Sequence, residues 1–310
     1  MIVLKRKAKP TERVLFSPDG KSLAVAGGRR KPLELWSVHD PNAPKFTLDV
    51  QLDRADLHFA FSPTGDQIIA VSDDALDSFD THSGQQVWGF MPEESSCIGG
   101  LDVSADGHIF LGKIHAYMDD APFQCWRLAG AAEPDRQWTV KKAPDSEWMC
   151  RGVVCLPRID HVGFAEYTPH PYASRIVLRS ASSGRRVSVL ECGDSELKQI
   201  AVSDDGRWLG ALTARAISVW STTKFNTAPT VMKNASRLAF TGLAFHPSGR
   251  FLAATSNDAT VKLYDTSNWA LATTYTWEIG RMRSVAFSPD GLLAAAGSDT
   301  GRVVVWDVDV

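Results

Sequence analysis

The sequence predicts an all-β protein assembled from seven copies of one repeat, and three observations carry this prediction. A turn motif that ends in glycine recurs along the chain, a strand of small apolar residues follows it, and a large residue ends the next strand. The clearest copy is C-terminal: 284–291 contains a Pro-Asp-Gly turn, 292–297 is small and apolar, and 301–307 ends in Trp-Asp. Self-similarity at a fixed period is typical of repeat folds, whose units bury their apolar faces against one another.

Six turn motifs share an apolar residue at the first position and a glycine at the fifth. They occupy 16–20, 61–65, 103–107, 202–206, 245–249 and 287–291. Their glycines are 45, 42, 99, 43 and 42 residues apart, so the long interval holds two periods and hides one degenerate unit. We place its turn at 154–158 and its next strand at 159–165. Proline, aspartate and glycine supply the restricted φ, the side chain-to-backbone hydrogen bond and the positive φ of a tight turn.

A second landmark lies about 16 residues after each turn, where a large residue ends an alternating strand. These residues are Trp36, Phe79, Trp126, Leu178, Trp220, Tyr264 and Trp306. A further strand follows, as at 46–51, 85–90 and 187–191. Each unit therefore consists of four short strands with turns rich in Gly, Pro, Asp and Ser. The period is too short for βαβ units, and no segment has sustained helical periodicity.

These motifs resemble the WD40 repeat family, whose period is about 40–45 residues. The shared features are the Phe-Ser-Pro-Asp-Gly turns, the Leu-Ala-Ala strands and the Trp-Asp ending. The resemblance covers essentially the whole chain and implies a seven-bladed β-propeller of four-stranded antiparallel blades, with residues 1–310 as a single domain. No Gly-His dipeptide precedes the repeats as it does in the family, and Asp258 is one of the few turn aspartates that are kept. We therefore do not expect the usual His-to-Asp network in each blade.

The position of each strand within a blade follows from this resemblance. The small-residue strand would be buried on both faces near the axis, and the large residue of the third strand would fill the wider gap between blades. The chain starts with an orphan strand at 2–4, and its last unit is one strand short. Placing 2–4 at the outer edge of the last blade would complete that blade and close the propeller.

Composition and charge exclude several classes of protein. The chain is 44% hydrophobic and 22% charged with a net charge of -3, which gives no bulk sign of nucleic-acid or membrane binding. The N-terminus has no apolar signal core, and no run approaches the roughly 18 residues of a membrane span. Five irregularly spaced cysteines favour reduced thiols. We expect a cytoplasmic protein, monomeric by itself, with no nucleic-acid and no membrane partner.

Catalytic signatures are absent from the sequence, including the nucleophile elbow, the P-loop, the zinc-protease motif and the dinucleotide fingerprint. No two of the eight histidines are paired at metal-ligand spacing on one element. His246 is expected to be structural, whereas His115 and His170 lie in predicted loops and are candidate ligands. Cys150 and Cys155 are expected to be buried free thiols on opposite faces of a strand. No catalytic residue, metal or cofactor is predicted.

Two long adjacent loops are the predicted location of function, because binding residues are usually carried by loops on a rigid scaffold. They are 115–122 in unit three and 166–174 in unit four, at the end opposite the Pro-Asp-Gly turns. They and the flanking residues would expose side chains of the types that protein interfaces enrich. These are Tyr117, Met118, Phe123, Trp148, Tyr167 and Tyr172.

Charge on the same end of the propeller is expected to be divided. Units two to four are acidic there, with pairs at 73–74 and 119–120, whereas the other units are basic. The basic side includes Arg29, Arg30, Lys31 and Arg283. Such a division would suit a partner of complementary charge. A solvated surface of mixed charge is the alternative interpretation.

The resemblance implies a non-enzymatic scaffold that binds a protein or peptide partner on its top face, and the lack of catalytic motifs agrees. The candidate partner-binding residues are Tyr117, Trp148, Tyr167, Tyr172, Arg29, Arg30 and Arg283. The alternative is a propeller enzyme, or a small-ligand or metal-binding protein, with its site in the central funnel. The residues expected at that funnel are Arg13, His58, Cys97, Lys198 and Arg283. This mixed set does not favour a metal centre.

Overall fold

The computed structural model describes residues 1–6, 10–28, 31–50, 58–72, 75–92, 98–113, 123–130, 132–140, 147–170, 172–214 and 216–308. Over these residues, 28 strands form seven four-stranded antiparallel sheets, which confirms the predicted seven-bladed β-propeller. Contacts divide the chain into two compact units. One comprises Met1–Leu57 and Ala201–Val310, and the other His58–Ile200. In the part of the chain described, no helix is long and apolar enough to cross a membrane.

The first unit holds blades 1, 6 and 7 and most of blade 5. Blade 1 consists of β2 (Thr11–Phe16), β3 (Ser22–Gly27), β4 (Leu33–Ser37) and β5 (Phe46–Leu48). Blade 5 consists of β18 (Leu197–Val202), β19 (Trp208–Thr213), β20 (Ala216–Ser221) and β21 (Thr230–Lys233). Blade 6 consists of β22 (Phe240–Phe245), β23 (Phe251–Ser256), β24 (Thr260–Asp265) and β25 (Leu271–Thr276). Blade 7 consists of β26 (Met282–Phe287), β27 (Leu293–Ser298), β28 (Arg302–Asp307) and β1 (Ile2–Lys5).

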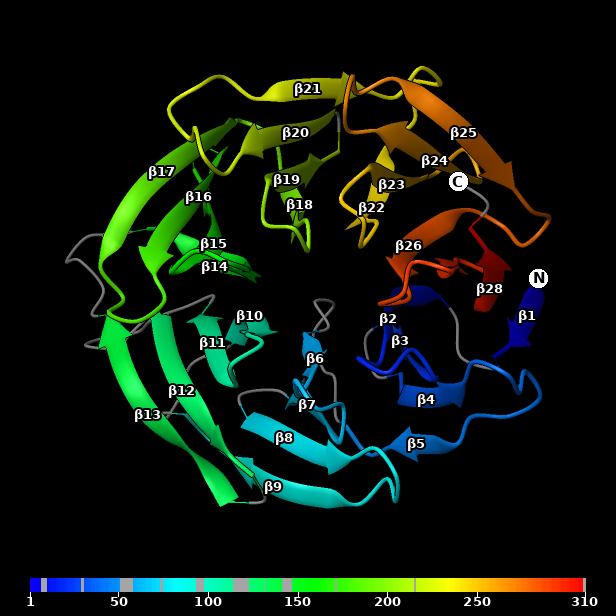
Figure 1. Cartoon of the computed structure of the whole chain (residues 1–310), viewed down its shortest axis with the longest axis horizontal. Coiled ribbons are helices and arrows are strands. Elements are labelled where there is room, and N and C mark those ends of the chain that lie inside the picture. Colours follow the sequence, from blue (N-terminus) through cyan, green and yellow to red (C-terminus); the bar gives the residue numbers. More distant parts are fainter. Residues whose placement is uncertain are drawn as a thin grey trace. The chain divides into compact units, whose positions relative to one another are not determined.

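The N-terminal strand completes blade 7, as predicted. β1 pairs antiparallel with β28, with Ile2 opposite Val305 and Leu4 opposite Val303, and the two strands lie side by side in Figure 1. Leu4 is fully buried in a cluster that also contains Val14 and other residues of blade 1. The strand therefore covers the edge of β28 and adds apolar contacts to the core of this unit.

A buried polar network continues this closure beyond β1. The Arg6 side chain donates from Nε to Glu34 Oε2 at 2.6 Å and from Nη1 to Thr11 Oγ1 at 3.0 Å. The Trp36 indole donates to the same Glu34 oxygen at 2.9 Å. Arg6 has no exposed side-chain surface and Glu34 has 9%. The N-terminal segment is thus tied to blade 1 as well as to blade 7.

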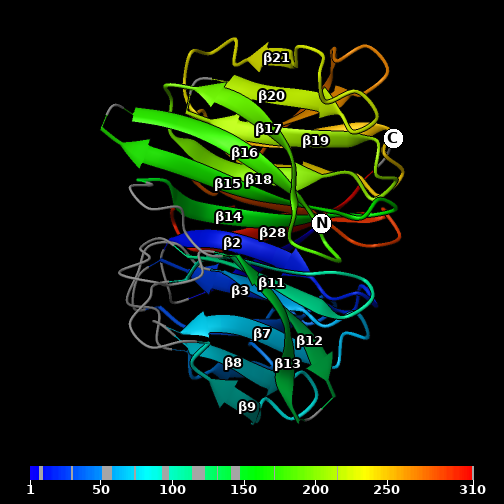
Figure 2. The ribbon, with the colours of Figure 1, turned by 90° about the vertical axis from the view of Figure 1, so that its left-hand side faces the viewer.

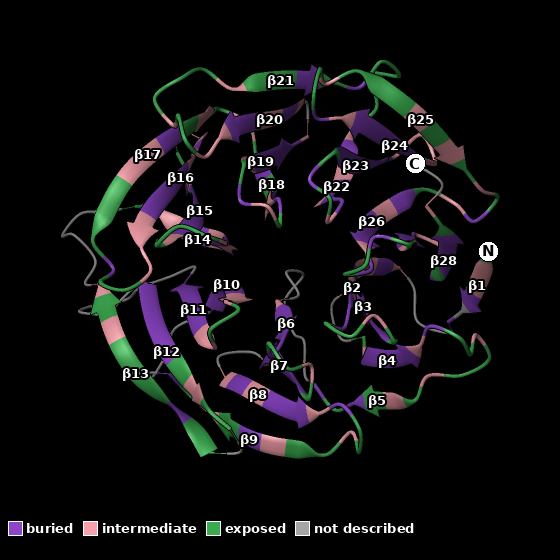
Figure 3. Ribbon diagram, viewed as in Figure 1, coloured by how far each residue is buried: buried purple, intermediate pink, exposed green. Residues whose placement is uncertain are grey.

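Burial follows the position of a strand in its blade. The small-residue strands β3 and β23 are buried at every residue, as predicted. The large residues that end the third strands are also buried, from 0% exposure for Leu178 to 9% for Trp126. The outer strands β17, β21 and β25 are largely exposed, which Figure 3 shows as green. The core of each blade therefore lies in its inner three strands.

Asp258 has a different partner from the histidine of the usual WD40 network. Its carboxylate accepts from Lys262 Nζ at 2.6 Å and from Thr260 Oγ1 at 2.5 Å within blade 6. Burial raises the pKa of Asp258, but the hydrogen bonds from Lys262 and Thr260 outweigh it and hold the pKa well below its usual range. An aspartate-lysine pair thus stabilises this turn.

The second unit holds blades 2, 3 and 4. Blade 2 consists of β6 (Phe59–Phe61), β7 (Gln67–Ser72), β8 (Ala75–Asp80) and β9 (Gln86–Phe90). Blade 3 consists of β10 (Ile98–Val103), β11 (His108–Lys113), β12 (Phe123–Ala129) and β13 (Ala132–Val140). Blade 4 consists of β14 (Met149–Leu156), β15 (His161–Pro169), β16 (Tyr172–Ser180) and β17 (Arg186–Gly193). The degenerate unit is therefore blade 4. Its turn starts about two residues later than the predicted 154–158, because β14 continues to Leu156 and the next strand starts at His161.

The predicted long loop at 166–174 is wrong, because most of it is strand. β15 and β16 pair without a register shift from His161 opposite Ser180 to Pro169 opposite Tyr172, and they run side by side in Figure 2. Each strand has nine residues, compared with six in β23 and β24 of blade 6. Pro169 is the last residue of β15, where a missing N–H is tolerated. Blade 4 thus carries an extended hairpin.

Candidate functional site

The end of the β15–β16 hairpin presents two tyrosines on one face of blade 4. Tyr167 lies opposite Ser174 and Tyr172 lies opposite Pro169, so the alternation of side chains places both rings on the same face. The rings stack with centroids 6.1 Å apart and an interplanar angle of 23°. Both side chains are half-buried. The extended hairpin therefore supplies a small, partly accessible aromatic surface.

Arg151 lies over this aromatic pair because β14 has a register shift. The pairing of β14 with β15 jumps between Cys150 and Gly152, which leaves Arg151 as the extra residue. Such a bulge changes the direction of a side chain. The Arg151 guanidinium lies 5.5 Å from the centre of the Tyr167 ring and forms an ion pair with Glu196. One guanidinium thus connects the tyrosine stack to the turn before β18.

The opposite face of the same hairpin carries a second arginine with an aromatic partner. Glu166 and Arg175 are directly opposite in the ladder, and Arg175 Nε donates to Glu166 Oε2 at 2.6 Å. The Arg175 guanidinium stacks on the Trp148 ring, 3.6 Å from its centre. Glu166 is nearly buried at 6% side-chain exposure, whereas Arg175 retains 22%. The pair is therefore shielded from water on the carboxylate side.

Burial sets the protonation behaviour of two groups here. It raises the pKa of Glu166, and the nearby Arg175 only partly offsets this effect. It also raises the pKa of the Tyr172 phenol, with a further contribution from Glu196 and an opposing one from Arg151. Tyr172 therefore remains a neutral hydroxyl at physiological pH.

We name this group of side chains the hairpin cluster. It consists of Trp148, Arg151, Glu166, Tyr167, Tyr172, Arg175 and Glu196. Three aromatic rings and two guanidinium groups are held by ladder pairing, by stacking and by two ion pairs. Aromatic and arginine side chains contribute most of the binding energy at protein interfaces, particularly where they are held in place before the partner arrives. The cluster therefore contains the residue types that protein interfaces enrich.

The structure brings together three of the seven predicted partner-binding residues. Trp148, Tyr167 and Tyr172 all belong to the hairpin cluster. Arg283 is half-buried at a register shift of β26, in the first unit. Tyr117, Arg29 and Arg30 lie outside the described residues, as do Met118 and most of the predicted acidic side. The predicted division of charge therefore stays a prediction.

Phe123 was predicted to be exposed, and this prediction is wrong. It is 4% exposed and packs against Phe164 with ring centroids 4.4 Å apart. Phe123 is the first residue of β12, so its side chain points into the core between β12 and β15 rather than into a loop. An aromatic residue at a strand start is a core residue when its ladder neighbours are apolar.

Sequence reasoning missed four charged members of the cluster, Arg151, Glu166, Arg175 and Glu196. The sequence did contain a signal for Glu166 and Arg175. A hairpin centred on 170–171 places Glu166 opposite Arg175, and opposite charges directly across a ladder are favourable. The position of Arg151 depends on the bulge, and that of Glu196 on the turn after β17, which no short motif predicts.

Among the described residues, no three His, Cys, Asp or Glu side chains are grouped to hold a metal ion. The described cysteines are free thiols. Burial raises the pKa of Cys125 and Cys192 to about 12, and that of Cys150 and Cys155 is also raised. These four thiols are therefore protonated at neutral pH and are poor nucleophiles.

The C-terminal repeats match a known family. Residues 234–265 and 273–307 match WD40, described as WD domain, G-beta repeat. Protein HIR1 of Mycosarcoma maydis is 32% identical over 123 residues, which are 37% of this chain and 12% of that protein. The probable cytosolic iron-sulfur protein assembly protein 1 of Yarrowia lipolytica is 44% identical over 64 residues, 20% of this chain and 19% of that protein.

A third relative is WD repeat-containing protein VIP3 of Arabidopsis thaliana. It is 38% identical over 82 residues, 22% of this chain and 26% of that protein. The chain thus matches between 12% and 26% of the length of these curated relatives. These matches are local and do not extend over the whole of any of the three proteins.

Solved structures match over nearly the whole chain. The β-propeller domain of Myceliophteria thermophila Cps50 (Swd1) has a TM-score of 0.76 and 15% identity, with 98% of each chain covered. Kuenenia stuttgartiensis hydrazine synthase has a TM-score of 0.79 and 15% identity, with 99% of this chain and 98% of that chain covered. At this identity the likeness extends to the fold alone, and one fold hosts both binding proteins and enzymes.

Proposed function

We propose that this chain, a seven-bladed β-propeller whose C-terminal repeats match WD40, is a non-enzymatic scaffold for protein interactions. The proposal includes the assignment of residues 1–310 to a single domain and a cytoplasmic location. Two relatives have names that refer to WD repeats or to assembly, and neither name specifies a partner for this chain. The hydrazine synthase match supports only a shared fold. The scaffold function is therefore argued from the surface of this chain.

The hairpin cluster is the observation that carries the proposal. Its Tyr167–Tyr172 stack lies under Arg151, and Arg175 lies over Trp148. Rigid aromatic rings lose little conformational freedom when a partner binds, and guanidinium groups add directional hydrogen bonds. We assign this cluster as the centre of a protein- or peptide-binding surface.

The chemistry of the partner follows from the two faces of the hairpin. Each guanidinium already has a carboxylate partner, so the cluster has little net charge to attract a strongly charged ligand. The rings and the arginine stems offer apolar surface with N–H donors at its edge. A partner that presents apolar or aromatic side chains beside backbone carbonyls fits this arrangement.

Replacing both Tyr167 and Tyr172 with alanine is expected to weaken partner binding by at least about 30-fold, the effect of losing one hot spot of about 2 kcal/mol. The half-buried rings lie at the hairpin end, so the melting temperature should fall by only a few degrees. The measurement is affinity capture with quantitative mass spectrometry, followed by titration of the recovered partner against both proteins.

The control replaces the same two tyrosines with phenylalanine, which keeps the stacked rings and removes only the hydroxyl groups. This variant should retain most of the binding. Equal capture by the wild type and by the alanine variant would exclude the hairpin cluster as the binding surface. A variant that loses both binding and its folded circular dichroism spectrum would be replaced by Arg151→Gln, which leaves the ladder intact.

A further inference from the structure

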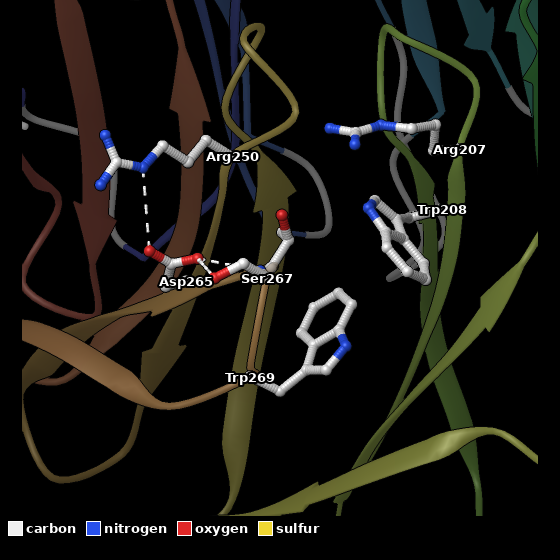
Figure 4. Close-up of a pocket in the computed structure, with 7 residues that line it drawn as sticks. Arg207, Trp208, Arg250, Asp265, Ser267 and Trp269 are labelled. Atoms are coloured by element: carbon white, nitrogen blue, oxygen red, sulfur yellow. Dashed lines mark hydrogen bonds and ion pairs between the residues drawn. The ribbon is translucent and has the colours of Figure 1, made fainter.

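A pocket of about 460 Å³ lies in the first unit, between the turns of blades 5 and 6. It is at the end of these blades that carries the Pro-Asp-Gly-type turns, and it shares no residue with the hairpin cluster. Its walls include Arg207, Trp208, Arg250, Asp265, Ser267 and Trp269, which Figure 4 shows. The volume lies within the range of small-ligand and peptide side-chain pockets.

The two guanidinium groups occupy equivalent positions in successive repeats. Arg207 follows the turn glycine Gly206, and Arg250 follows Gly249. Arg207 Nη2 donates to the Gly249 carbonyl at 3.5 Å, which brings the two turns together. The side chains of Arg207 and Arg250 are 58% and 66% exposed. The rim of the pocket is therefore cationic and open to solvent.

Two indole rings form the floor between these arginines. Trp208 and Trp269 pack edge to face, with ring centroids 5.1 Å apart and an interplanar angle of 84°. In Figure 4 the Arg207 guanidinium extends into the space above Trp208, and the Trp269 ring lies below it. Aromatic faces beside cationic groups suit a ligand that has both an apolar and an anionic part.

Trp269 has an unusual backbone conformation for its type. Its φ is 58°, in the left-handed region that bulky residues rarely adopt. The same turn occurs in blades 2 and 4, where the backbone N–H of Gly84 and of Gly184 donates to the carbonyl four residues earlier, as that of Trp269 does. Those glycines have φ of 72° and 69°. Blade 6 thus places an indole at a glycine position, and strained positions of this kind concentrate at functional sites.

The hydrogen bonds already made by the pocket residues determine which groups a ligand must supply. Asp265 Oδ1 already accepts from the Ser267 N–H and hydroxyl, and Arg250 pairs with Asp265 Oδ2 at 3.7 Å. Arg207 pairs through Nε with Asp205. Each guanidinium has five N–H donors, more than these contacts use. The pocket therefore offers donors, whereas its carboxylate acceptors are engaged.

The Trp208 indole adds a donor at the floor. Its Nε1 atom is buried and has no hydrogen-bond partner among the described residues. A buried donor without an acceptor is unfavourable, so a ligand oxygen at this position would stabilise the site. A cationic ligand is disfavoured, because it would meet two guanidinium groups at the rim.

We propose that this pocket binds an acidic peptide segment in which an apolar side chain precedes a carboxylate. The apolar side chain packs on Trp269 and Trp208. The carboxylate pairs with Arg207 and Arg250, and a backbone carbonyl accepts from Trp208 Nε1. This site is independent of the hairpin cluster, so it can exist whether or not that cluster binds a partner.

The test uses fluorescein-labelled, amidated peptides with the cores Gly-Leu-Glu-Glu-Gly, Gly-Phe-Glu-Glu-Gly and Gly-Trp-Glu-Glu-Gly, titrated by fluorescence polarisation. At least one is expected to bind about tenfold or more tightly than the same peptide with glutamine for glutamate, since charge-assisted pairs with arginine are the strong ones. The Trp208 indole N–H signal, assigned in an NMR spectrum with the Trp208→Phe variant, should shift on addition of that peptide.

Trp269→Gly is the decisive variant, because it restores the residue that blades 2 and 4 have in this turn. Relief of the left-handed backbone at Trp269 should largely offset the lost contact with Trp208, so the melting temperature should stay within a few degrees of wild type. The peptide affinity should fall by about tenfold or more, because the variant lacks one aromatic wall of the pocket. Arg207→Gln and Arg250→Gln should each lose about fivefold, whereas Lys224→Gln, an exposed charge in the β20–β21 turn, should not change the affinity.

Three results would overturn the proposal. The first is that none of the acidic peptides binds more tightly than its glutamine counterpart. The second is wild-type affinity in a folded Trp269→Gly protein. The third is a peptide with phosphoserine in place of the first glutamate that binds more than about tenfold more tightly, which would assign the site to phosphoryl groups.

Discussion

Replacing Arg6 with alanine is expected to lower the free energy of unfolding by about 3–5 kcal/mol, the usual effect of removing one partner of a buried ion pair. Arg6 has no exposed side-chain surface, and its Nε lies 2.6 Å from Glu34 Oε2. Without Arg6, the Glu34 carboxylate would remain in the core with the Trp36 indole as a donor. Thr11 Oγ1 and the Val25 carbonyl would also lose a hydrogen bond. Urea unfolding followed by circular dichroism measures the change.

The matched control replaces both partners, as Arg6→Met with Glu34→Leu. Removing both charged groups leaves no isolated charge in the core, so this double variant should be much more stable than Arg6→Ala. Deleting residues 1–8 should be more damaging still, because it also removes β1 from the edge of β28 and buried Leu4 from the core. If the Arg6→Ala protein lost less than about 1 kcal/mol of unfolding free energy, the pair would contribute no more than a surface ion pair. That result would contradict the proposed role of Arg6 in tying the N-terminal segment to blade 1.

Replacing Arg175 with alanine is expected to lower the free energy of unfolding by about 3 kcal/mol at neutral pH. Its guanidinium pairs with the nearly buried Glu166 at 2.6 Å and stacks on Trp148 at 3.6 Å. The change leaves a buried carboxylate without its cation and a tryptophan without its covering group. We expect the lower end of the range for buried pairs because Arg175 is 22% exposed.

This loss should depend on pH in a defined direction. The pKa of Glu166 is already raised by burial, and removing Arg175 raises it further. A carboxyl whose pKa is higher in the folded than in the unfolded state binds more protons when folded. The free energy of unfolding therefore falls as pH rises through the range between the two pKa values. This pH range begins near 4.5, the ordinary pKa of a glutamate side chain, and extends upward. The deficit relative to wild type should therefore be smaller at pH 5 than at pH 7.5.

The double variant Arg175→Ala with Glu166→Gln distinguishes this electrostatic effect from lost packing. It removes the charge that the single variant leaves uncompensated, so it should recover much of the stability at pH 7.5 and lose the pH dependence. Unfolding curves at the two pH values provide the measurement. A deficit that is the same at both values would show that Glu166 does not carry the effect.

The repeats illustrate what local sequence can predict. Turn motifs such as 287–291 and small-residue strands such as β27 encode their own geometry, because the turn needs a residue with positive φ and the strand must be buried on both faces. Their spacing indicated seven units, including the degenerate one whose turn follows Leu156. The unpaired strand at 2–4 completed the last blade, because an open β-sheet edge must be covered.

The candidate sites were less accessible to sequence reasoning. Trp148, Tyr167 and Tyr172 were recognised by residue type, but 166–174 was interpreted as a loop. The structure shows instead a continuous ladder between β15 and β16, in which Glu166 lies opposite Arg175. Phe123 was assigned to the surface because it follows the predicted loop 115–122, although its neighbours in space bury it.

Sequence patterns were sufficient to predict the repeat, the four strands of each unit, the turns and the strand that completes the last blade. These features depend on residues close together in the chain or on a period that repeats. Three-dimensional packing was needed to show that Arg6 pairs with Glu34, that Arg151 lies over Tyr167, and that Trp208 packs against Trp269. Each of these contacts joins side chains from different strands, blades or turns, and a bulge or a single left-handed residue can redirect a side chain without changing the repeat pattern.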